Sequence, residues 1–225
     1  MTQIETEITA LKKELVNMWM LVQSQLNKAK DAMTNFDKDL AREVLVKEKR
    51  VNSFELKIDR DCENIFALYC PVAIDLRFLL AALKINTNLE RIGDIAAGVA
   101  KYVIESPVNF DLAALESTST MRMYEEAINI LTDTRIAFEN EDTALARSIF
   151  KRDEMLDAVN RNATNTIGEL IKADIGGLNE ALFMLSIIRK LERIGDQSKN
   201  IAEEIIFYVE AKILKHSGSS KSKKD

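Results

Sequence analysis

Apolar residues recur every three or four positions along most of the chain, which is the spacing of one face of an α-helix. Helix-breaking residues interrupt this pattern at a few places only. They predict six helices of roughly thirty residues, each about 45 Å long. The interruptions between these helices are short, so consecutive helices must fold back on each other as antiparallel neighbours. The interruptions are Asn35–Asp37, Pro71, Ser106–Pro107 with Asp111 as the next N-cap, Asn140–Asp142, Asp174–Gly177 and the segment from His216.

The second half of the chain repeats the first. Asn35, Asp37 and Leu40 recur 105 positions later, and farther on the offset becomes 102. The pentapeptide at 90–94, Glu-Arg-Ile-Gly-Asp, is identical to the one at 192–196. The sequence therefore predicts an all-α protein of two tandem three-helix bundles related by internal duplication. We place the first bundle at 1–106, the second at 107–215 and a disordered tail at 216–225.

Composition supports helices and limits the possible functions. Of 225 residues 47% are hydrophobic, and the chain has only seven Gly and two Pro. A net charge of −5 argues against nucleic acid as a partner. The start of the chain carries acidic residues, unlike a secretory signal, and no apolar stretch is long enough to insert into a membrane. Cys62 and Cys70 are expected to be buried thiols in a reducing compartment, so we expect a cytoplasmic protein.

Acidic residues at helical spacing are the main candidates for chemistry. Glu90 and Asp94 are four positions apart, so they share one face of a helix about 5–6 Å from each other. If each hairpin is centred on its turn, residue 48 lies opposite 94 and residue 52 opposite 90. The second half repeats this arrangement. The eight matched residues are Glu48, Asn52, Glu90, Asp94, Asp153, Asp157, Glu192 and Asp196.

These oxygen-bearing pairs are expected on the outside of the bundles. In the segment 85–103, Glu90 and Asp94 lie about 140° to 180° from the centre of the apolar stripe. Carboxylate and amide oxygens suit a divalent or trivalent metal ion such as Mg²⁺, Ca²⁺, Mn²⁺, Zn²⁺ or iron. The alternative is a solvated acidic face that binds no metal. Because Asn52 brings no charge, the first site is expected to be the weaker.

Catalytic chemistry has little support in the sequence. The one histidine is His216, and the chain has neither the Glu-x-x-His ligands of di-iron bundles nor a Gly-rich phosphate loop. We therefore expect no enzyme. Gly93 and Gly195 each cost roughly 1 kcal/mol within a helix, which predicts a close approach of another helix or of a ligand at both positions.

The duplicated pentapeptide and the segment Pro71–Arg77, Pro-Val-Ala-Ile-Asp-Leu-Arg, resemble the PhoU family over nearly the whole chain. That resemblance implies a cytoplasmic protein, often a homodimer, that negatively regulates phosphate uptake and the phosphate-starvation response. It implies two partners, the ATPase of the phosphate ABC transporter and a phosphate-responsive sensor histidine kinase. It also implies surface metal clusters at Glu/Asp-x-x-x-Asp motifs. Asp75 and Arg77 are expected to cap and fix the start of the third helix, and a role in partner contact is the alternative.

Two other functional classes stay open at this stage. One is a metal-dependent enzyme or a metal-storage protein that uses the carboxylate clusters. The other is a structural helical scaffold in which the matched acids have no role.

Overall fold

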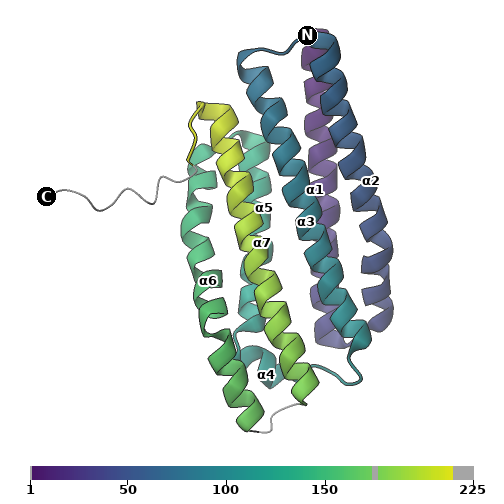
Figure 1. The fold of residues 1–225 in the computed structure, drawn as a ribbon, viewed down its shortest axis with the longest axis vertical. Helices are drawn as coiled ribbons and strands as arrows, with labels where there is room; N and C mark the ends of the chain where they lie inside the picture. The colour runs from purple at the N-terminus through teal and green to yellow at the C-terminus, as the bar shows by residue number, and fades with distance from the viewer. Residues whose placement is uncertain (1, 174–176, 215–225) are drawn as a thin grey trace, which may run out of the picture.

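The computed structural model describes residues 2–173 and 177–214, which form seven helices and no strand (Figure 1). The all-α prediction is confirmed. The predicted disordered tail at 216–225, which includes His216, lies outside the described residues, as does most of the predicted break at 174–177. The helices are α1 (Gln3–Asn35), α2 (Lys38–Tyr69), α3 (Ala73–Glu105), α4 (Leu112–Ser117), α5 (Thr120–Asn140), α6 (Thr143–Lys172) and α7 (Leu178–Glu210).

The prediction of six long helices was wrong at the fourth, which is divided into α4 and α5. The Thr118 hydroxyl donates to the carbonyl of Ala114 at 2.7 Å and lies 2.7 Å from the hydroxyl of Thr120. Ser119 then takes a left-handed conformation with φ 59°. Hydroxyl side chains that bond to nearby backbone compete with helix continuation. A Ser/Thr cluster therefore ends the short helix and starts the next.

Helix caps repeat between the two halves and support the duplication. The Asp37 carboxylate accepts from the backbone N–H of Leu40 at 2.9 Å, and Asp142 accepts from Leu145 at the same distance. These bonds satisfy N–H groups that have no partner within the helix. Asp111 caps α4 as expected, with its carboxylate 2.9 Å from the N–H of Ala114.

Helices α1, α2 and α3 form one three-helix half, and α5, α6 and α7 form the other (Figure 1). Helices α3 and α7 lie side by side along the middle and run in opposite directions. Buried aliphatic residues fill both halves and continue across this contact. Trp19 of α1 adds a bond between the halves by donating its indole N–H to the carbonyl of Leu131 at 3.2 Å.

Two expectations about the turn between α2 and α3 were wrong. No side chain caps the start of α3, whose N-cap is Val72. Arg77 does fix this end of α3, but by donating to the carbonyl of Tyr208 on α7 at 3.3 Å, so it also joins the two halves. Cys62 is buried as expected, but Cys70 is exposed because it ends α2 in a left-handed conformation just before Pro71.

None of the helices in the described segments combines the length and the apolar character that crossing a membrane requires.

Candidate functional site

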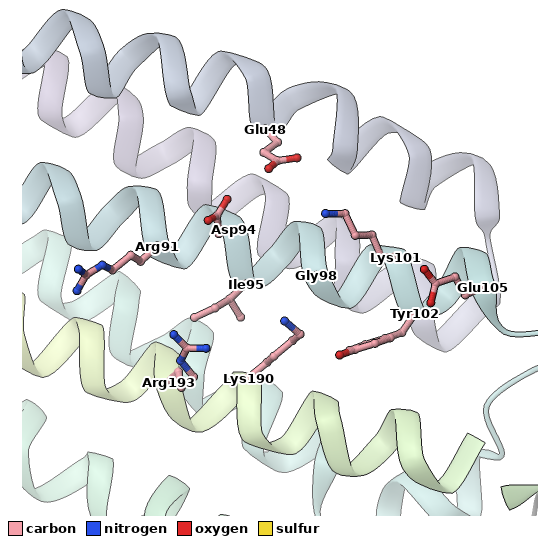
Figure 2. A pocket seen from close by; sticks show the side chains of 10 residues that line it. All are labelled: Glu48, Arg91, Asp94, Ile95, Gly98, Lys101, Tyr102, Glu105, Lys190 and Arg193. Atoms are coloured by element: carbon pink, nitrogen blue, oxygen red, sulfur yellow. The ribbon is translucent and has the colours of Figure 1, made fainter. Parts of the chain in front are cut away.

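In the first half, the hairpin of α2 and α3 brings Glu48 and Asp94 together. Both side chains line one groove and point toward each other (Figure 2). Glu48 and Glu90 are half-buried, whereas Asp94 and Asn52 are exposed. The predicted pairing of 48 with 94, and the outward orientation of this cluster, are both observed.

Glu55 of α2 lies close enough to Glu90 for its charge to act on that carboxyl, and the pairing of Asn52 with Glu90 stays a prediction. Burial, then the charges of Asp94 and Glu55, raise the pKa of Glu90 from 4.5 to about 7. Burial, then Asp59 and Asp94, also raise the pKa of Glu55. Sequence reasoning missed Glu55 and Asp59. Their four-residue spacing, the same as that of Glu90 and Asp94, could have identified them.

Asp59 is fixed by a hydrogen bond from α3. The buried amide of Asn86 donates to the Asp59 carboxylate at 2.8 Å and to the backbone carbonyl of Glu55 at 2.9 Å. These two hydrogen bonds position the α2 acids against α3. The first half thus gathers five acidic side chains, which we call the first cluster: Glu48, Glu55, Asp59, Glu90 and Asp94.

In the second half, a lysine occupies the middle of the acids. Lys199 donates to Asp153 at 2.5 Å and to Asp196 at 3.0 Å. Burial opposes the charge of Lys199, but its bonds to these two carboxylates outweigh burial and raise its pKa. Asp153 was expected on the outside and is instead 2% exposed. That expectation was wrong because a helical wheel does not show the space that a neighbouring helix leaves for a side chain.

Gly195 leaves that space. A Cβ built at Gly195 would overlap the Asp153 carboxylate and come within 2.7 Å of a methyl group of Leu156. At Gly93, the matching glycine, an added Cβ would lie 3.2 Å from a methyl group of Val51. The predicted close approach is therefore observed at both glycines. It is a helix contact in the first half and a carboxylate contact in the second.

Glu192 of the second half has Asn160 as a hydrogen-bond partner. Glu192, Asp157 and Asp196 are half-buried. Burial, then the charges of Asp196 and Asp157, raise the pKa of Glu192, and a hydrogen bond with Asn160 opposes the shift. Asn160 is the counterpart of Glu55 at the 105-residue offset. The second cluster, defined as Asp153, Asp157, Glu192 and Asp196, thus has an amide and an ammonium beside its acids.

Neither cluster is a ready-made metal cage. Among residues 2–173 and 177–214, no three Asp, Glu, Cys or His side chains are arranged to hold one ion. Mg²⁺ keeps several of its waters and binds through one or two carboxylates, which Glu48 and Asp94 can supply.

Comparison with known proteins finds one family in both halves. The family model described as PhoU domain matches residues 15–103 and again residues 120–205. The phosphate-specific transport system accessory protein PhoU of Edwardsiella tarda is 32% identical over 96% of this chain and 88% of its own length.

Solved structures agree with the sequence relatives. The crystal structure of PhoU from Pseudomonas aeruginosa is 30% identical, with a TM-score of 0.84 over 93% of this chain and 100% of that one. The phosphate transport system regulatory protein PhoU of Streptococcus pneumoniae is 27% identical, with a TM-score of 0.84 over 94% and 99%.

Proposed function

Because the chain belongs to the PhoU family, we propose that it is a cytoplasmic negative regulator of phosphate uptake and of the phosphate-starvation response. It acts as an adaptor between the ATPase of a phosphate ABC transporter and a sensor histidine kinase, and it works as a homodimer. The observation that carries this proposal is the match of the family to both halves, at 15–103 and 120–205. Relatives named as accessory proteins of phosphate transport support it.

The family consists of accessory proteins and not enzymes, so the chain acts by binding. The alternative of a metal-dependent enzyme therefore loses its support.

The turn between α2 and α3 offers a surface for a protein partner. Val72 and Ile74 are 71% and 50% exposed, although both are large and apolar. Arg77, three residues farther on, holds this end of α3 against α7. Exposed apolar side chains on a rigid turn are typical of a protein contact.

Co-purification tests the adaptor role. We expect the tagged chain to retain the transporter ATPase in extracts from phosphate-replete cells, and Ile74→Asp to lose it. Leu182→Asp is the matched control, because Leu182 is 48% exposed on α7 and far along the chain from this turn. If both variants retain the ATPase equally, the turn between α2 and α3 is not the surface that contacts it.

A deletion strain tests the regulatory role itself. We expect higher phosphate uptake and expression of starvation genes in phosphate-rich medium, with both restored by the intact chain. Unchanged uptake together with unchanged gene expression would contradict the proposed function.

Metal binding at the carboxylate clusters remains a proposal, and the geometry favours the first cluster. That cluster has five acids and Ala97 at the position where the second half has Lys199. A hydrated divalent cation such as Mg²⁺ or Mn²⁺ supplies there the positive charge that Lys199 supplies in the second cluster. This reverses the order expected from Asn52 alone.

A further inference from the structure

The groove between α3 and α7 has a basic side that the carboxylate clusters do not explain. It encloses about 410 Å³, a volume within the usual range for small-molecule sites. Arg91, Lys101, Lys190 and Arg193 all line it. Within the described part of the chain, none of these four side chains has an ion-pair partner within 4.0 Å. Four unpaired cations around one groove are unusual in a chain of net charge −5.

Two of the three acids that line this groove lie toward its α2 side. Glu48 and Asp94 face each other at the α2 side, and Lys101 is directed toward them (Figure 2). Glu105 is at the end of α3. The charged ends of Lys190 and Arg193 instead point from α7 toward α3 (Figure 2). The basic side of the groove is therefore built mainly from α7.

Lys190 lies in a notch that fits its side chain. A Cβ added at Gly98 would be 2.5 Å from the Lys190 ammonium, so only glycine there leaves the side chain in place. The ammonium is also 5.7 Å from the centre of the Tyr102 ring, which packs on Phe183. Burial, then the nearby Arg193 and Lys101, lower the pKa of Lys190. The fold thus holds a half-buried ammonium beside other cations.

The internal repeat supplies the contrast. At the 102-residue offset, Lys190 corresponds to Asn88 and Gly98 corresponds to Asn200. Asn88 and Asn200 fill the equivalent contact between α3 and α7 by hydrogen bonding to each other at 3.4 Å. One copy of this contact between α3 and α7 therefore packs with two neutral amides. The other copy packs a lysine against a glycine. Packing alone does not require the lysine.

We propose that this groove binds a phosphate group, as inorganic phosphate or as part of a short phosphate chain, through Lys190, Arg193 and the Tyr102 hydroxyl. Ammonium and guanidinium groups with a hydroxyl are the donors that phosphate oxygens accept most strongly. The volume exceeds what one phosphate needs, so a chain of phosphates has room. The site goes beyond the proposed adaptor role and uses no residue of the second cluster.

Calorimetric titration of the full chain tests the proposal, with inorganic phosphate and tripolyphosphate as separate probes. The double variant Gly98→Asn/Lys190→Asn installs the pair that Asn88 and Asn200 already form. We expect it to weaken binding about tenfold or more, since a charge-assisted bond is lost. Lys151→Asn, at an exposed lysine of α6, removes the same charge elsewhere and should leave affinity unchanged.

The outcomes separate the ligands. Binding of inorganic phosphate that depends on Lys190 assigns the free ion, and binding of tripolyphosphate alone with that dependence assigns a phosphate chain. Equal affinities in the double variant and Lys151→Asn, or no binding of either probe by the intact chain, would overturn the proposal. Arg193→Gln repeats the test at an exposed residue if the double variant fails to fold. Loss of co-purification without loss of phosphate binding would concern only the adaptor role.

Discussion

The two halves carry the same pentapeptide but neutralise their acids differently. In the second half Lys199 bridges Asp153 and Asp196, so the cation is part of the chain. In the first half Ala97 occupies that position, and burial together with the neighbouring acids raises the pKa of Glu90 to about 7. The comparison teaches that a duplicated motif fixes where carboxylates gather. The neighbouring residues then decide whether a cluster is closed by an internal charge or left open to an external one.

Among substitutions that test this difference between the halves, removing Lys199 should cost the most stability. Lys199→Ala leaves Asp153 buried without its positive partner, and breaking a buried pair in this way costs about 3–5 kcal/mol. Denaturant unfolding at neutral pH measures the loss. Adding Asp153→Asn should recover much of it, because the unpaired charge is gone. A loss below about 1 kcal/mol, the range of an exposed pair, would contradict the role of Lys199 as an internal cation.

The two glycines of the pentapeptide should respond differently to alanine. Gly195→Ala would overlap the Asp153 carboxylate and Leu156, and overpacking of this kind costs about 1–3 kcal/mol. Gly93→Ala meets Val51 at 3.2 Å, and the better helix propensity of alanine offsets about 1 kcal/mol of that crowding. Melting temperatures of the two variants provide the measurement. Equal destabilisation by both would mean that the clusters are packed alike.

The pH dependence of stability should reflect Glu90. Its pKa is 4.5 ordinarily and about 7 in the fold, so the folded state holds more protons between these values. The contribution of Glu90 to the free energy of unfolding is therefore fully present below pH 4.5 and is lost as the pH rises through 7. After a discount for solvent screening, Glu90→Gln should stabilise the protein above pH 7 by about 1 kcal/mol.

Unfolding at a series of pH values checks this prediction. Exposed Glu154→Gln on α6 is the control and should leave the pH profile unchanged. A Glu90→Gln profile that parallels the original one at every pH would show that Glu90 titrates normally.

The fold could be predicted largely from the sequence because its signals are local. Asp111 caps a helix as predicted, Asp37 and Asp142 cap helices at predicted breaks, and the identical pentapeptides reveal the duplication. The break at Ser119 was missed because it depends on hydroxyls bonding to particular carbonyls. Counting residues about Pro71 also placed Glu48 opposite Asp94 correctly.

The candidate site was harder to predict because its details depend on how helices face one another. The effect of Glu55 on Glu90 depends on which side of α2 faces α3. The burial of Asp153 depends on space left by Gly195 on another helix. The contact of Lys190 with Gly98 depends on how α3 lies against α7, which no periodic pattern encodes.

Titration with Mn²⁺ at pH 8 tests most directly whether the first cluster is open and the second is closed. We compare the intact chain with Glu90→Gln/Asp94→Asn and with Glu192→Gln/Asp196→Asn, which change the same positions of the two pentapeptides. We predict that only the first pair of substitutions abolishes the calorimetric binding signal. Retained binding in that variant, with loss of the signal in the second, would contradict the account.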